Sequence, residues 1–182
     1  MRVHVVRDIV PTDSIASGML AAWIWLGGSF PGHIDIARDN HYHSILFGRE
    51  VRSTTRQIHR SYLYDFSHLL VTIPEITACD LACSQDARCH PTEVGEVILQ
   101  LAMRYKFSER DCIELMRENT RRPRYTAGLH LLLRTLGGPP IPPLEDRAPI
   151  QPYAKSPEGS EKTKQTDNST QEQTAVKKEH HE

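Results

Sequence analysis

The sequence predicts an α+β fold, similar to an α/β sandwich, with helices packed on a small antiparallel-centred sheet. Short segments with the alternation of β-strands are interspersed with longer segments in which apolar residues recur at helical spacing. The composition changes after Gly137 to a Pro-rich and then polar run with almost no large apolar residues. The residues before this change are enough to bury a core, so the ordered fold is expected there and a disordered tail after it.

The first half is expected to contain most of the strands. Residues 2–10 are predicted as a strand because Val3 and Val5 alternate with polar residues. Pro11 and Asp13 begin a helix, and Gly27 and Gly28 end it. The apolar stripe of that helix is Ile15, Met19, Trp23 and Leu26. Residues 33–47 are predicted as a hairpin, with a strand that carries Asp35, a turn at Asp39-Asn40 and a second strand that opens with His41-Tyr42-His43.

The second half is expected to be mainly helical. Residues 53–70 are predicted as a long helix with the stripe Ile58, Tyr62, Phe66 and Leu69, followed by a short strand at 70–73. Residues 77–90 are predicted as a loop rich in Cys and Asp, and helices are expected from Pro91 and over 108–118 and 125–136. This order predicts four parts, which are an α+β core (1–76), a Cys-rich connecting loop (77–90), a helical subdomain (91–138) and a disordered Pro-rich and polar tail (139–182).

Charge and composition narrow the functional classes. Basic and acidic residues nearly balance, so any nucleic-acid contact is expected from a local patch and not from an overall positive charge. Before the tail, Lys106 is the single Lys among many Arg residues, and Arg binds phosphate with two parallel hydrogen bonds. We identify no signal peptide and no apolar run of membrane-spanning length. An intracellular protein with free thiols or metal-bound cysteines is therefore expected, without membrane contact.

The predicted hairpin suggests a metal site. His41 and His43 project from one face of their strand, because side chains alternate with period two. Asp35 on the neighbouring antiparallel strand would complete a set of two imidazoles and one carboxylate. Such a set suits a divalent ion, for which Mn²⁺ or Mg²⁺ is expected. The alternative is that both histidines are structural or exposed.

Residues 33–73 resemble the origin-binding domain of polyomavirus large T antigen. The resemblance covers the Asp39-Asn40 turn, the strand His43-Ser44-Ile45-Leu46-Phe47, and the basic loop and helix through Arg49, Arg52 and Arg56. That domain shares its fold with the nicking domains of parvovirus-type Rep proteins and with the papillomavirus initiator. Residues 96–118 also resemble the helical start of the zinc-binding helicase subdomain of large T. No G-x-x-x-x-G-K-[ST] sequence is present, and the zinc ligands of that subdomain are missing.

The resemblance implies a DNA-binding protein of viral replication-initiator type without a helicase motor. Such a protein would act in the host nucleus and regulate or assist viral DNA replication or transcription. It would contact DNA through Arg49, Arg52, Thr54, Thr55 and Arg56, which the prediction places in a loop and the first turn of a helix. Amides at a helix N-terminus hold phosphate, and Arg reads guanine edges. The alternative for these residues is an ordinary solvated helix face.

A metal-dependent single-strand nickase is the enzymatic alternative. It would combine the ion at Asp35, His41 and His43 with a Tyr nucleophile that attacks the scissile phosphate. Tyr105, followed by Lys106, is the preferred nucleophile, and Tyr62 and Tyr64 are its competitors.

A viral accessory adaptor is the third alternative. Cys79, Cys83, Cys89 and His90 form a candidate zinc set, although their spacing fits no standard finger. Within this segment, residues 81–85 (Leu-Ala-Cys-Ser-Gln) approach the Leu-x-Cys-x-Glu motif by which viral oncoproteins bind retinoblastoma-type pocket proteins, with Gln85 in place of the Glu. The adaptor would bind host proteins through residues 81–85 or through the tail.

Overall fold

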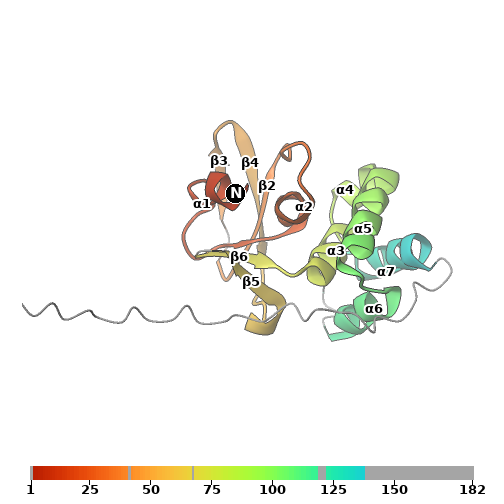
Figure 1. Cartoon of the computed structure of the whole chain (residues 1–182). Coiled ribbons are helices and arrows are strands. Elements are labelled where there is room, and N and C mark those ends of the chain that lie inside the picture. Colours follow the sequence, from red (N-terminus) through yellow and green to blue (C-terminus); the bar gives the residue numbers. More distant parts are fainter. Residues whose placement is uncertain (1, 41, 67, 119–121, 138–182) are drawn as a thin grey trace, which may run out of the picture.

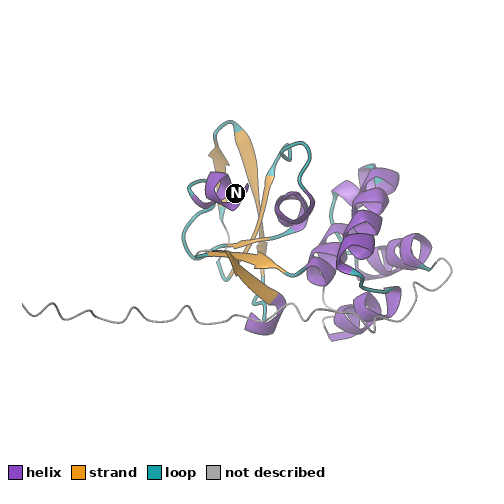
Figure 2. Ribbon diagram, viewed as in Figure 1, coloured by secondary structure: helices purple, strands orange, loops and turns teal. Residues whose placement is uncertain are grey.

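A mixed six-stranded sheet and a group of helices make up the computed structural model, which describes residues 2–40, 42–66, 68–118 and 122–137 (Figures 1 and 2). The strands are β1 (Ile15–Ala16), β2 (Ile34–Arg38), β3 (His43–Leu46), β4 (Arg49–Thr55), β5 (Leu63–Phe66) and β6 (Leu69–Thr72). The helices are α1 (Arg2–Arg7), α2 (Gly18–Leu26), α3 (Pro74–Ala82), α4 (Asp86–Cys89), α5 (Pro91–Tyr105), α6 (Glu109–Glu118) and α7 (Tyr125–Leu136), with a 3₁₀ turn at Arg60–Tyr62. The predicted α+β class is confirmed.

The sheet has the strand order β3-β4-β2-β1-β6-β5. The pairs β2–β4 and β1–β6 are parallel, whereas β1–β2, β3–β4 and β5–β6 are antiparallel. The short β1 therefore lies in the middle and joins a three-stranded part to the β5–β6 hairpin. Figure 1 shows α3 to α7 gathered in a helical layer beside the sheet, and α2 packs against both β2 and α3.

The core lies between the sheet and these helices. The strands contribute Ile34, Ile36 and Val71, which are fully buried, and the helical layer contributes Ile98 and Leu101 from α5. Helix α5 forms as predicted, with Pro91 at its first position, where a missing N–H costs nothing. The strand near residues 70–73 and the helices over 108–118 and 125–136 are also confirmed as β6, α6 and α7.

The prediction of a strand over residues 2–10 is wrong, because residues 2–7 form α1. Val6 is fully buried and Val10 is nearly so, while Val5 is largely exposed. The residues that contact the core thus follow helical spacing, from Val3 through Val6 to Val10. Val3 and Val5 do not share a buried face, because Val3 packs against the core and Val5 is exposed.

The prediction of a helix over residues 53–70 is also wrong. This segment contains the end of β4, a 3₁₀ turn, β5 and the start of β6. The i+4 and i+3 spacing of Tyr62, Phe66 and Leu69 spans two strands of a hairpin, whose turn includes His68 at a positive φ of 76°. The hairpin of β5 and β6 is local, but the pairing of β4 with β2 and of β6 with β1 is not local to the segment.

Residues 77–90, predicted as a connecting loop, are largely helical. Helix α3 ends at Ala82, and α4 follows at Asp86–Cys89. Eight of the nine residues of α3 are buried, so the segment has no polar face from which helical periodicity could be read. The predicted boundary at residue 76 falls inside α3, while the tail at 139–182 lies outside the described residues.

Candidate functional site

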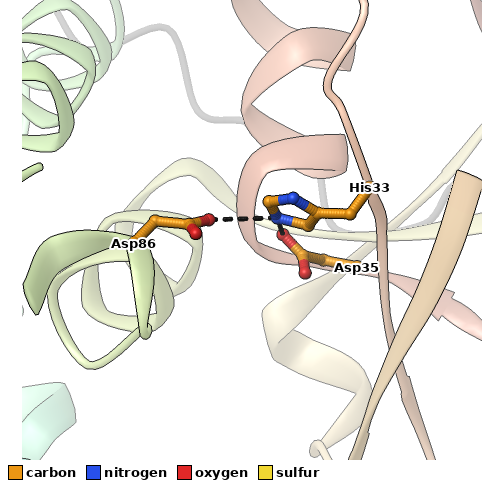
Figure 3. Close-up of side chains that lie close together, drawn as sticks. All are labelled: His33, Asp35 and Asp86. Carbon is orange, nitrogen blue, oxygen red and sulfur yellow. Dashed lines mark ion pairs between the residues drawn. The ribbon is translucent and has the colours of Figure 1, made fainter. Parts of the chain in front are cut away.

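A cluster of one imidazole and two carboxylates lies where β2 faces α4 (Figure 3). The Nε2 atom of His33 lies 3.2 Å from Oδ2 of Asp35 and 3.0 Å from Oδ2 of Asp86. One ligand atom from each residue lies within 4.8 Å of the other two, which is close enough for all three to hold one metal ion. Their side chains are 14%, 19% and 24% exposed, so the cluster is half-buried but accessible.

The backbone around the cluster positions Asp35. His33 lies in a bend directly before β2 and Asp35 is the second residue of β2, and this arrangement brings the two side chains into contact. The Asp35 carboxylate accepts a hydrogen bond from the N–H of Met19 at 2.8 Å, in the first turn of α2. A Cβ added to Gly18, which has a positive φ of 51°, would lie 2.6 Å from Oδ2 of Asp35. Glycine thus allows the helix to approach the carboxylate closely.

Arg52 on β4 completes the cluster with a positive charge. Its Nη1 atom lies 3.0 Å from Oδ1 of Asp86 and 3.2 Å from Nε2 of His33. The single Nε2 atom therefore faces two carboxylates, which require a donor, and one guanidinium, which requires an acceptor. Either a proton or a metal ion on Nε2 would satisfy both carboxylates, at the expense of the contact with Arg52. The three side chains could therefore hold a cation, and the guanidinium of Arg52 lies beside that position.

The predicted metal set of Asp35, His41 and His43 is not the set that the structure assembles. Strand β3 does not pair with β2, because β4 lies between them, with Asp35 opposite Arg52 and Arg52 opposite His43. The backbones of Asp35 and His43 are thus two strands apart, about 10 Å. His41 lies outside the described residues. Asp35 belongs to the cluster, and among the described residues His33 and Asp86 supply the other two ligand atoms.

His33 makes the cluster sensitive to pH. The hydrogen bond with Asp35 raises the pKa of His33 above its ordinary value, and the charges of Asp35 and Asp86 add to this effect, against the desolvation that lowers it. A folded-state pKa above the unfolded one means that the protonated form stabilises the fold. This stabilisation is fully present below the unfolded pKa, about 6.5, and is lost as the pH rises through the raised pKa of the folded protein.

We therefore expect that, in the presence of a chelator, the free energy of unfolding falls as the pH rises above about 6.5. The measurement is urea denaturation between about pH 6 and 8.5, and a ring titration of His33 by NMR gives its pKa directly. The change His33→Gln should remove this component of the pH dependence. His90→Gln, at an exposed His that contacts Glu93, is the matched control and should keep it. An identical slope in wild type and His33→Gln would contradict the assignment.

The residues predicted to bind DNA lie on β4 and directly after it, not on a helix. Arg49 donates a hydrogen bond to the carbonyl of Pro31 at 3.0 Å, and its guanidinium lies 5.1 Å from the ring centre of Phe30. Arg56 forms an ion pair with Asp80. Thr54 and Thr55 end β4 and line a cleft together with Arg56. The helix N-terminus on which the prediction relied is absent, and each of the three arginines contacts a carbonyl or carboxylate of the protein.

Tyr105 has a structural position at the end of α5. Its hydroxyl donates to the carbonyl of Trp25 at 3.0 Å, and the two rings pack edge to face with centroids 5.3 Å apart. Lys106 caps the helix in a left-handed conformation, with φ of 54°. Of the competitors, Tyr62 donates to Glu118 and Tyr64 packs on Trp25. No tyrosine is among the described residues that line the cleft beside Asp35.

The cysteines are not gathered into a zinc site. Cys79 is fully buried, Cys89 is exposed and Cys83 is half-buried against Met116. In the part of the chain that the structure describes, Cys79, Cys83, Cys89 and His90 do not bring four ligand atoms together. Burial raises the pKa of Cys83 to about 11, which keeps this thiol protonated at neutral pH. Leu81, the first residue of the predicted host-binding segment, is fully buried in α3.

Comparison of the chain with protein-family models, with curated proteins and with solved structures finds no match in any of the three. The description of the site therefore depends on the side chains themselves. Among the described residues, no helix combines the length and the apolar character that crossing a membrane requires.

Proposed function

We propose that this protein binds a divalent cation between His33, Asp35 and Asp86 and uses the cation to act on a phosphate ester. The observation that carries the proposal is the convergence of one imidazole and two carboxylates from two segments of the chain, His33 and Asp35 in one and Asp86 in the other. A mixed nitrogen and oxygen set suits Mn²⁺, and Mg²⁺ is bound by carboxylates in a similar manner. The cation would also relieve the repulsion between the two carboxylates, which the guanidinium of Arg52 offsets at Asp86.

A cation at this position would polarise a phosphoryl oxygen and lower the pKa of a bound water. Single-stranded DNA is the substrate class that the sequence resemblance suggests. Because the hydroxyl of Tyr105 is bonded to Trp25, we propose that water and not tyrosine is the nucleophile. The water oxygen would bond to phosphorus as the ester P–O bond breaks, and a proton would pass from the water to the leaving oxygen or to solvent.

Titration of the full chain with Mn²⁺, followed by calorimetry or by the EPR signal of free Mn²⁺, tests the cation site. We expect binding of one ion, which Asp35→Asn and His33→Gln should each weaken by at least about tenfold. The reason is that each change removes one of three protein ligands. His90→Gln changes an exposed histidine beside Glu93 and should leave the affinity unchanged. Equal Mn²⁺ binding in wild type and Asp35→Asn would refute the site.

Incubation of the same variants with Mn²⁺ and end-labelled single-stranded DNA tests the activity. Cleavage without a protein–DNA adduct, lost in Asp35→Asn, is the result expected for a cation-bound water. A covalent adduct that disappears in Tyr105→Phe would instead establish the tyrosine nickase and overturn this mechanism. Cation-dependent retention of DNA without cleavage would favour the DNA-binding regulator over an enzyme.

A further inference from the structure

A second group of polar side chains lies in a cleft beside the cation cluster. The cleft has a volume of about 690 Å³ and is bounded by the start of α2, the end of β4, the end of α3 and the segment before α7. Asp35 lies in its lining, and so do Ser53, Arg56, Asp80 and Arg122. A cleft of this size accommodates a ligand as large as a mononucleotide.

Two buried arginines share one carboxylate in this cleft. The Nη1 atom of Arg122 lies 2.6 Å from Oδ1 of Asp80, and Arg56 forms an ion pair with Oδ2 of the same carboxylate. The side chains of Arg56, Asp80 and Arg122 are only 13%, 10% and 7% exposed. One negative charge thus faces two positive charges in a largely desolvated place. Arg124 also lines the cleft and donates to the carbonyl of Ser84, which adds a further positive charge.

Several buried donors in the same lining make no hydrogen bond. The Nε atoms of Arg56 and Arg122 have no partner among the described residues, and neither does the hydroxyl of Ser53. Asp80 is bonded to a terminal nitrogen of each arginine and to the Nε atom of neither. Buried polar groups are nearly always satisfied, because leaving one unpaired is costly. An acceptor from outside the described residues, such as the oxygen of a ligand, would satisfy these three donors.

We propose that this cleft is a phosphate-binding pocket in which Arg56 and Arg122 hold the phosphate group and Ser53 donates to it. A phosphate monoester has up to two negative charges and several acceptor oxygens, which match the excess positive charge and the donors without partners. The planar fork of arginine suits such bidentate contacts. The proposal goes beyond the cation site, because these contacts require no metal. Inorganic phosphate, a mononucleotide and the 5′-phosphate of a DNA strand are the three sources of the same chemistry.

Calorimetric titration of the full chain in the presence of a chelator tests the pocket with inorganic phosphate, with AMP and with a short 5′-phosphorylated oligonucleotide. We expect saturable binding of at least one of the three, and the tightest one identifies the source. Arg122→Gln should weaken that binding by about tenfold or more, and Ser53→Ala by a smaller factor. Arg110→Gln, at an exposed arginine paired with Glu114, is the matched control and should bind as wild type does.

The pocket is refuted if none of the three ligands binds, or if they bind equally well to wild type, Arg122→Gln and Ser53→Ala. Ser53→Ala keeps the ion pairs of Asp80 intact, so it tests the pocket even if Arg122→Gln does not fold. The chelator removes divalent cations, so the phosphate titration reports on the pocket without any contribution from the cation site. Failure of phosphate binding overturns the pocket and leaves the Mn²⁺ titration unaffected, and failure of Mn²⁺ binding leaves the pocket unaffected.

Discussion

Replacing Asp80 with asparagine should lower the free energy of unfolding by about 3–5 kcal/mol. Asp80 pairs with Arg56 and Arg122, and the three side chains are almost completely buried. Without the carboxylate, two guanidinium charges face each other in a place that water screens poorly. Removing one partner of a buried pair is costly for this reason, even where the intact pair contributes little net stability.

Urea denaturation of the Asp80→Asn variant at neutral pH measures the loss. Glu114→Gln removes the acidic partner of the exposed Arg110 and serves as the control, with an expected change below about 1 kcal/mol. Added phosphate should stabilise Asp80→Asn more than it stabilises wild type, because the anion takes over the role of the missing carboxylate. A loss for Asp80→Asn as small as that of the control would show that the two arginines do not depend on Asp80.

Replacing Trp25 with alanine should cost about 3–5 kcal/mol of stability. Trp25 at the end of α2 is 7% exposed. The centroid of its ring lies 5.3 Å from those of Phe66 and Tyr105 and 5.8 Å from that of Tyr64. These rings come from β5 and from the last turn of α5, so one side chain joins the sheet to the helical layer. The indole N–H also donates to the buried carbonyl of Thr72 at 2.8 Å.

Denaturation followed by far-UV circular dichroism, with the near-UV signal as a measure of aromatic packing, checks this expectation. Trp25→Phe keeps an aromatic ring but leaves the Thr72 carbonyl without its donor, and should cost about 1–3 kcal/mol. Leu99→Ala, at an exposed position of α5, should change stability by about 0.5 kcal/mol or less. A loss below about 1 kcal/mol for Trp25→Ala would mean that the sheet and the helices do not depend on this contact.

The predicted helices α5, α6 and α7 each have one buried face, whereas the helix predicted before Gly27 begins only at Gly18, as α2, and is buried on most sides. In α6, for example, Cys112 and Met116 are buried at i and i+4, while polar residues surround them. Helix α3 was missed because it is buried on nearly all sides and its sequence shows no period. The strands after residue 53 were missed in part because β4 pairs with β2 and β6 pairs with β1, and neither partner is adjacent in the sequence. Local patterns do not contain that information.

The candidate site could be predicted only in part. His33-x-Asp35 has the same spacing as His41-x-His43, and period two on a strand would have placed both of its side chains on one face. Asp86 has no such signal, because α4 packs on α5 and α3 and its first residue reaches His33 only through this tertiary arrangement. The sharing of Asp80 between Arg56 and Arg122 depends in the same way on contacts 24 and 42 residues apart in the chain.

The shortest strand of the sheet has a mechanical consequence. Ile15 and Ala16 alone join β2 on one side to β6 on the other, so the two parts of the sheet are coupled through a seam two residues wide. The chain passes from this seam through Ser17 and Gly18 into α2, where the N–H of Met19 binds the Asp35 carboxylate. A shift of the β5–β6 hairpin against the rest of the sheet would thus move the donor that orients Asp35. The geometry of the His33, Asp35 and Asp86 cluster therefore depends on how rigidly Ile15 and Ala16 hold the two parts of the sheet together.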